Sequence, residues 1–201
     1  VNYGAAYGFM TPLTLRYVHG LLELVRTIGD LSGKHIIEIG GGFGGQFKII
    51  SDIFTVGSYT IVDIPEALAL TSKVLDYFPR AKRRSVLVAP SAADVSGGIA
   101  GGSLDDPGFM LEEYDLCYSV YAFTELDYPS RVRYWEMVFA RCKKGFVLDN
   151  SRCQYDEDVV EGNQRLGMEK VAELLRAKGL TVDFELEEPQ TGCTNEIVTW
   201  F

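Results

Sequence analysis

A glycine-rich turn with a carboxylate just ahead of it is the part of the sequence best suited to chemistry. Residues 35–39 read HIIEI and residues 40–46 read GGGFGGQ, after which apolar residues resume at a helical period. This order is typical of a strand, a tight turn and a helix start. Glycines let the backbone approach a ligand closely, and the unpaired N–H groups of the helix start would face that ligand. The stretch therefore predicts a cradle for a cofactor.

The glycines alone do not identify this cofactor. Gly40, Gly42 and Gly44 fit the spacing G-x-G-x-G. Gly40, Gly42 and Gly45 equally fit the G-x-G-x-x-G spacing of dinucleotide enzymes. The next predicted strand ends in Asp63, about twenty residues after the glycines, where an acidic side chain can accept hydrogen bonds from ribose hydroxyls. We therefore expect a nucleoside in the cradle.

Glu38 discriminates between nucleoside cofactors. It lies inside the first predicted strand, two residues before the turn, so its carboxylate would lie beside the ligand. A negative charge is a poor neighbour for a pyrophosphate, but it suits a cofactor that carries an ammonium and a sulfonium charge. Glu38 therefore favours S-adenosylmethionine over NAD.

At these residues the sequence resembles the class I methyltransferases, whose first motif is E-x-G-x-G-x-G. It resembles the sugar O-methyltransferases most, through IEIGGGFGGQ at 37–46, VDIPE at 62–66, SVYAFTEL at 119–126 and VLDN at 147–150. The resemblance covers roughly residues 30–201. It implies an α/β, Rossmann-like fold, with a seven-stranded and mostly parallel sheet whose last strand is antiparallel. It also implies methyl transfer from S-adenosylmethionine to a hydroxyl of a small polar acceptor, a sugar.

The motifs and the predicted strand ends together supply the candidate binding residues. Those expected at the cofactor are Glu38, Gly40, Gly42, Gly44, Gln46, Asp63, Ile64, Ser91, Ala92 and Ser119. Ser91 and Ala92 are assigned to the adenine by resemblance only, because Pro90-Ser91 replaces the more usual acidic residue after the third strand. Tyr121, Asn150 and Asn195 are expected at the acceptor, where an amide can both donate to and accept from a sugar hydroxyl.

Methyl transfer from a sulfonium depends mainly on proximity and alignment, but a sugar hydroxyl is a weak acid whose proton must leave. Glu125, with Asp127 second, is the expected acid–base group, as a general base or as ligand to a divalent cation. Two alternatives stay open: Asp127 caps the following helix, and Glu125 bonds to backbone beneath the site. No residue is assigned to a metal. His35 begins a strand at the edge away from the ligand, and His19 is expected in the core or on the surface.

The elements that must position these residues follow from periodicity and punctuation. Helices are expected at 11–28, from about 44, and at 65–77, 129–142 and 163–178, and strands at 35–39, 59–63, 85–89, 114–119, 145–149, 180–187 and 195–201. Residues 96–108 are expected to form a Gly- and Asp-rich loop. The link 188–194 is too short for a crossover helix, so the last strand must be antiparallel to its neighbour. The start of the first helix should lie near the site, so Asn2, Tyr3, Tyr7 and Arg16 are expected to border the site. Alternatively, the aromatic residues among them only cover the sheet.

Bulk properties limit the partners. The 201 residues suit one domain, with residues 1–30 bordering the site and 31–201 forming the Rossmann-like core. The net charge of −9 argues against nucleic acid and anionic membranes and favours a small-molecule acceptor. The four cysteines show no metal-ligand spacing, so we expect reduced thiols in a cytoplasmic protein. Residue 1 is Val rather than Met, which is compatible with a larger parent chain, and a homo-oligomer is left open.

Three other functions compete with sugar O-methylation. The acceptor could be another small molecule, methylated at oxygen or nitrogen. The chain could instead be a non-catalytic S-adenosylmethionine-binding module of a larger assembly. A dehydrogenase is the third alternative, against which Glu38 and the antiparallel last strand both argue.

Overall fold

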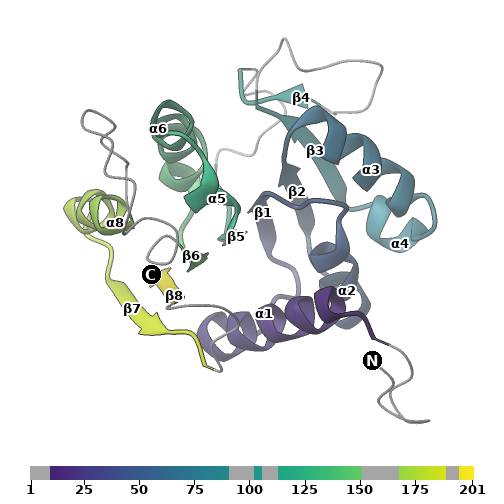
Figure 1. The fold of residues 1–201 in the computed structure, drawn as a ribbon, viewed down its shortest axis with the longest axis horizontal. Helices are drawn as coiled ribbons and strands as arrows, with labels where there is room; N and C mark the ends of the chain where they lie inside the picture. The colour runs from purple at the N-terminus through teal and green to yellow at the C-terminus, as the bar shows by residue number, and fades with distance from the viewer. Residues whose placement is uncertain (1–9, 91–101, 106–112, 151–167, 189–194) are drawn as a thin grey trace.

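An eight-stranded sheet runs through the molecule, in the order β4-β3-β2-β1-β5-β6-β8-β7 (Figure 1). The computed structural model describes residues 10–90, 102–105, 113–150, 168–188 and 195–201. The strands are β1 (His35–Ile39), β2 (Ser58–Val62), β3 (Ser85–Ala89), β4 (Gly102–Ser103), β5 (Leu116–Val120), β6 (Gly145–Asp149), β7 (Val182–Leu186) and β8 (Glu196–Trp200).

The strand order reverses beside β1, which is parallel to β2 on one side and to β5 on the other. In open α/β sheets, ligands bind at the carboxyl ends of the strands where the order reverses. At the far edge, β8 is antiparallel to both β6 and β7. The predicted Rossmann-like arrangement with an antiparallel last strand is therefore confirmed, and the glycine turn lies at the point where a ligand is expected.

The expected number of seven strands is wrong by one. The additional strand, β4, consists of two residues that pair parallel with the end of β3, Gly102 with Val88 and Ser103 with Ala89. It lies within 96–108, which was expected to be a loop. Two residues are too few to show an alternating pattern, so this pairing comes from the neighbouring strand rather than from local sequence.

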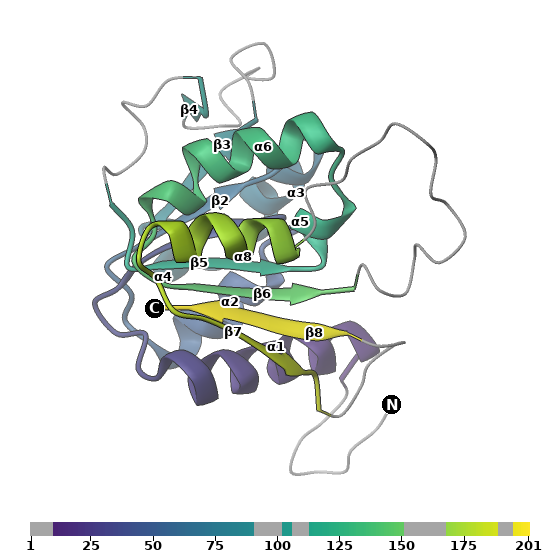
Figure 2. The ribbon, with the colours of Figure 1, turned by 90° about the vertical axis from the view of Figure 1, so that its left-hand side faces the viewer.

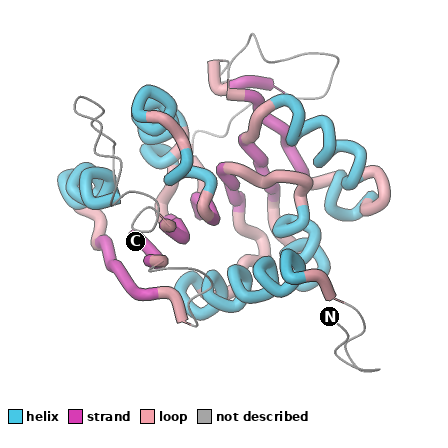
Figure 3. The backbone as a smooth tube through the Cα atoms, viewed as in Figure 1, coloured by secondary structure: helices cyan, strands magenta, loops and turns pink. Residues whose placement is uncertain are grey.

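Helices cover both faces of the sheet (Figures 2 and 3). They are α1 (Pro12–Ile28), α2 (Gly45–Ile53), α3 (Pro65–Leu75), α4 (Pro79–Lys82), α5 (Ala122–Glu125), α6 (Tyr128–Met137) and α8 (Met168–Ala177), with a 3₁₀ turn, η3 (Phe139–Arg141), where the expected helix 129–142 breaks. Leu24, Phe47 and Leu68 bury α1, α2 and α3 in one apolar core. Tyr134 and Val171 bury α6 and α8 in the core on the opposite face. None of the helices within the described ranges is long and apolar enough to cross a membrane.

Capping residues define where the first helix, α1, begins and ends. Thr11 precedes it and accepts a hydrogen bond from the Thr14 N–H at 3.0 Å, and Pro12 occupies its first turn. It ends at Gly29, whose φ of +86° is easily adopted only by glycine. The chain then enters β1, so the first turns of α1 lie at the ligand edge, as predicted.

Candidate functional site

The turn after β1 is held in one conformation by contacts on several sides. Gly40 has a φ of +78°, and a Cβ at this position would lie 2.0 Å from the Ala122 Cβ, so only glycine fits. The N–H of Gly42 donates to Asp63 Oδ2 at 2.8 Å, and its carbonyl accepts from the Thr71 hydroxyl. The backbone at the carboxyl end of β1 is therefore fixed before any ligand arrives.

A cavity of about 160 Å³ lies between the start of α1 and this turn. The helix contributes Leu13, Arg16 and Tyr17 to its wall. The other lining residues are Tyr118 and Val120 of β5, Tyr121 directly after it, Glu38, Gln46 and the glycine turn. The structure thus brings together the predicted residues Glu38, Gly40, Gly42, Gln46 and Tyr121. Gly44, with a φ of +82°, lies at the start of α2.

Glu38 lies in this wall as a buried carboxyl group. Its side chain is 4% exposed, and Oε2 has no hydrogen-bond partner among the described residues. The pKa of Glu38 is raised to about 8, mainly by burial; the nearby Tyr59 hydroxyl opposes this change, and the charge of Asp63 adds a smaller increase. Such a group ionises readily when a cation is placed beside it, so it fits the ammonium group of S-adenosylmethionine.

Two further buried polar atoms of the wall lack partners in the described part of the chain. They are the amide nitrogen of Gln46 and the hydroxyl oxygen of Tyr118. An unpaired buried polar atom is costly, and native structures contain few of them. The wall therefore suits a ligand that has polar groups at this end.

Asp63 follows β2, as the ribose-binding hypothesis requires. Its two carboxylate oxygens accept from the backbone N–H groups of Gly42 and Ile64, each at 2.8 Å, and each oxygen has a second lone pair for a ligand. Burial raises the pKa of Asp63, and the two backbone bonds oppose this change. Ile64 leaves 56% of its surface exposed beside it, an apolar face available to a base.

Ser119, Ser91 and Ala92 are the remaining residues predicted to bind the cofactor. Ser119 is fully buried; its hydroxyl donates to the Ile39 carbonyl and accepts from the Phe123 N–H, both at 3.2 Å, so it joins β1 to α5 beneath the site. Ser91 and Ala92 lie outside the described residues. The same holds for Asn2, Tyr3 and Tyr7 of the N-terminal segment.

Tyr121, which was predicted to contact the acceptor, lies in the wall of the cavity. It has a φ of +65°, the one positive value among the non-glycine residues that the structure describes. Such strain persists only where surrounding contacts enforce it, and it is enriched at functional sites. The Asn195 amide nitrogen lies 3.4 Å from the Tyr121 hydroxyl, and the side-chain oxygen Oδ1 of Asn150 accepts from the Thr124 hydroxyl at 2.8 Å.

Sequence reasoning missed a polar cluster behind Tyr121. Glu187, which is fully buried at the end of β7, accepts from the Asn195 amide at 2.7 Å. On its other side, His19 Nε2 lies 3.2 Å from Glu187 Oε1, close enough to pair when the imidazole is protonated. Alternation along β7 places Glu185 and Glu187 on one face, which was the available signal for Glu187. Nothing local identified His19 as its partner.

The two acid–base candidates lie outside the wall of this cavity. Asp127 caps α6 by accepting from the Ser130 N–H at 3.0 Å, and Ser130 lowers the pKa of Asp127. Glu125 is exposed at the end of α5 and makes no hydrogen bond or ion pair with a described residue. His35 bonds to Ser58 at the opposite edge, as expected. No group of three or more His, Cys, Asp or Glu within the described ranges could hold a metal ion.

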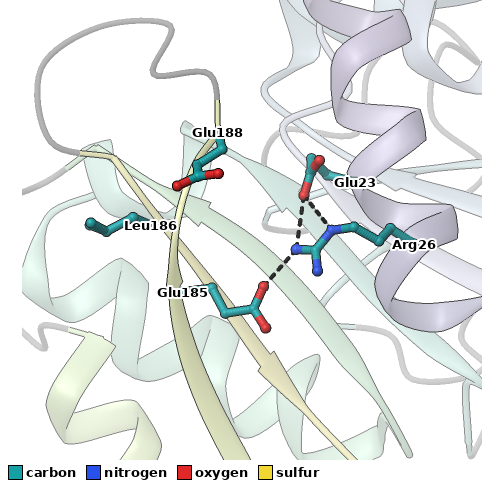
Figure 4. Close-up of a pocket in the computed structure, with 5 residues that line it drawn as sticks. All are labelled: Glu23, Arg26, Glu185, Leu186 and Glu188. Carbon is teal, nitrogen blue, oxygen red and sulfur yellow. Dashed lines mark hydrogen bonds and ion pairs between the residues drawn. The ribbon is translucent and has the colours of Figure 1, made fainter.

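A larger pocket, of about 540 Å³, lies between α1 and β7 (Figure 4). Arg26, the cation among the described residues of its lining, pairs with Glu23 at 2.9 Å and with Glu185 at 2.6 Å, as Figure 4 shows. Because Arg26 and Glu23 belong to α1 and Glu185 to β7, we assign these ion pairs the role of joining α1 to the edge strand. Cys117 and Cys142 are free thiols in the core, and the other two cysteines, Cys153 and Cys193, lie outside the described residues.

Comparison with known proteins identifies the fold. No family model and no curated protein matches the chain. Among solved structures, it is similar to the methyltransferase domain of bacterial CtHen1 (15% identity, 93% of this chain and 98% of that chain, TM-score 0.62). It is also similar to magnesium protoporphyrin IX methyltransferase of Synechocystis PCC 6803 with bound SAH (8% identity, 96% of this chain and 88% of that chain, TM-score 0.59). A third similar structure is the [4+2]-cyclase SpnF (13% identity, 92% of this chain and 79% of that chain, TM-score 0.63). The chain therefore has the Rossmann-like fold of the class I methyltransferases.

Proposed function

We propose that the chain is an S-adenosylmethionine-dependent O-methyltransferase that acts on a hydroxyl of a small polar acceptor, a sugar. One observation carries the proposal: a buried, unpaired carboxylate oxygen of Glu38 beside a rigid glycine turn at the point where the strand order reverses. A pyrophosphate would keep the Glu38 carboxyl group protonated and supply no counter-ion for it, whereas an ammonium group would favour the ionised form and find its counter-ion.

On the cofactor side, Glu38 would hold the ammonium group and Asp63 the ribose hydroxyls. Ile64 would cover the adenine together with Ser91 and Ala92. When bound, the cofactor supplies an electrophilic methyl group on a sulfonium. The rigid turn positions the ligand without a further ordering cost, which is the main contribution that this reaction requires of a protein.

On the acceptor side, Tyr121, Asn150 and Asn195 offer neutral hydrogen-bonding groups. Such groups match the hydroxyls of a sugar, which both donate and accept. We propose Glu125 as the group that takes the acceptor proton, because its carboxylate is exposed and makes no bond with a described residue. Asp127 is the second candidate, and its helix-capping bond makes it the weaker one.

The fold by itself does not determine the reaction, since one similar structure is a [4+2]-cyclase. The decisive experiment therefore measures cofactor binding and methyl transfer separately. Isothermal titration of the wild type and of Asp63→Ala with S-adenosylmethionine, S-adenosylhomocysteine and NAD tests the cofactor. Asp52→Ala, which removes an exposed carboxylate on α2, is the matched control.

We expect micromolar binding of the two adenosyl ligands, none of NAD, and loss of binding in Asp63→Ala alone. Transfer of a deuterated methyl group to a panel of free and nucleotide-linked sugars, followed by mass spectrometry, then tests the acceptor. Binding of NAD alone would overturn the cofactor assignment. Cofactor binding with methylation of amines instead of sugars would overturn the acceptor assignment.

A further inference from the structure

We propose that Arg16, Tyr118 and Gln46 form a subsite for the α-carboxylate of the cofactor, beside Glu38, which binds its α-ammonium group. The inference rests on the proposed function, since it presumes S-adenosylmethionine as the ligand. It assigns Tyr118 and Arg16, which the motifs do not mark, to binding.

The three side chains gather beneath one turn of α1. A Cβ added at Gly20 would lie 2.9 Å from the Tyr118 hydroxyl and 3.5 Å from Gln46 Oε1, so both polar groups lie close under this glycine. Arg16 comes four residues earlier, on the same face of the helix, and lines the same cavity. Residues from α1, α2 and β5 therefore converge at one end of the cavity.

Tyr118 and Gln46 both offer a donor that nothing in the described residues accepts. The unpaired atoms are the Tyr118 hydroxyl and the Gln46 amide nitrogen, both buried. Burial, and secondly the charge of Glu38, raise the pKa of Tyr118 well above its usual value, so the hydroxyl keeps the proton that it would donate. Two buried donors without acceptors indicate an acceptor on the ligand.

Arg16 adds a positive charge that no described carboxylate neutralises. Its guanidinium carbon lies 5.5 Å from the centre of the Tyr121 ring, which orients it at the cavity. Arg26 on the same helix is different, because it pairs with Glu23 and Glu185. In a chain with a net charge of −9, an uncompensated guanidinium beside a cavity favours an anionic ligand group.

The wall of the cavity therefore combines two donors and a cation with the carboxyl group of Glu38, which is the register partner of Tyr118 on the neighbouring strand. A simple anion would leave Glu38 without a counter-ion, and a simple cation would leave the donors without partners. An amino-acid zwitterion satisfies both sets. The volume of about 160 Å³ is below that of a site for a whole drug-sized ligand and suits one end of the cofactor.

Decarboxylated S-adenosylmethionine, which keeps the ammonium and sulfonium groups, tests this assignment. Isothermal titration compares its affinity with that of S-adenosylmethionine for the wild type, Arg16→Gln, Tyr118→Phe and the control Arg26→Gln. We expect the wild type to bind S-adenosylmethionine roughly ten- to a hundredfold more tightly than the decarboxylated ligand. This is the range of affinity that charge-assisted hydrogen bonds to a carboxylate contribute. Arg16→Gln and Tyr118→Phe should weaken S-adenosylmethionine about tenfold each and leave the decarboxylated ligand unchanged. Arg26→Gln should change neither.

Equal affinity of the wild type for both ligands would overturn the carboxylate subsite and leave the cofactor assignment standing. Equal weakening of both ligands in the variants would also overturn it, because it would show a structural effect. A wild type that binds neither ligand would overturn the proposed function itself. Tyr118→Phe removes only an unpaired buried hydroxyl, so this variant should fold at least as well as the wild type.

Discussion

Glu38 is a carboxyl group held where water cannot stabilise its charge. Its pKa is about 8 in the folded chain, against the ordinary value of 4.5 expected when unfolded. Between these values the folded state binds more protons than the unfolded state, so stability falls as pH rises. The contribution of the raised Glu38 pKa to the free energy of unfolding is fully present below about pH 4.5, and it is lost as the pH approaches 8. The cost at pH 7 is about 3 kcal/mol.

Glu38→Gln should remove this pH dependence, because Gln is neutral throughout. Urea unfolding of both proteins should show that the variant gains about 3 kcal/mol relative to the wild type between pH 5 and pH 7.5. Other titrating groups cancel in this difference. The variant should also bind S-adenosylmethionine far more weakly. A difference in stability that does not change with pH would show that Glu38 is ionised in the folded chain at low pH.

The same carboxyl group predicts proton release on cofactor binding. Near pH 7 the group is mostly protonated, and an ammonium placed beside it favours the ionised form. Binding of S-adenosylhomocysteine should therefore release close to one proton, and the affinity should rise with pH until about pH 8. Titrations in phosphate and Tris, which differ in ionisation enthalpy, measure this release. Uptake of protons, or equal release in Glu38→Gln, would contradict the assignment.

At the scale of elements, α1 closes the cavity because Gly20 lets it approach β5. Gly20→Ala sets two effects against each other: a gain of about 1 kcal/mol in helix propensity and an overpacking cost of about 1–3 kcal/mol against Tyr118. We expect unfolding stability to change by less than about 2 kcal/mol. Affinity for S-adenosylmethionine should fall, since the added methyl group displaces Tyr118 or the helix. Leu22→Ala, at an exposed position of α1, is the control. Unchanged affinity would mean that α1 does not shape the site.

The edge strand β7 is joined to α1 by two contacts of different kinds. Glu187→Ala should destabilise the chain by about 1–3 kcal/mol, because it removes the 2.7 Å acceptor of the buried Asn195 amide. Glu187→Gln retains an acceptor oxygen and should recover most of this loss. Glu185→Ala removes an exposed pair on the same strand face and should cost less than about 1 kcal/mol. Chemical denaturation of the three variants tests this order. Equal losses in Glu185→Ala and Glu187→Ala would show that burial does not separate the two contacts.

For the whole molecule, the sheet could be predicted because its signals are local. Five-residue apolar strands, Pro12 and Gly29 at the ends of α1, and the short link before β8 each specify their own element. The break of the expected helix 129–142 into α6 and η3 could not be predicted, because packing of Phe139 against Trp200 on a distant strand accompanies it. The same holds for β4, whose pairing depends on β3.

The site could be predicted where the position follows from a strand end. Glu38 and Asp63 lie where the motif spacing placed them, at the carboxyl ends of β1 and β2. Contacts that join distant elements could not be predicted: Arg16 with Tyr121, and His19 with Glu187. These contacts depend on how α1 crosses the far edge of the sheet, and no residue spacing along the chain specifies that crossing.

The charge of the whole chain bears on the class of acceptor. Binding to a nucleic acid is driven by cations that replace its counterions, and a net charge of −9 opposes any polyanion. Fluorescence anisotropy with labelled single-stranded RNA should therefore show no binding up to about 100 µM protein at physiological salt. The stronger test is the same titration at low salt. A local basic patch would then bind the RNA more tightly, whereas a negatively charged surface would repel the RNA more strongly. Binding that strengthens as salt falls would contradict a small-molecule acceptor and make a nucleic acid the acceptor to test.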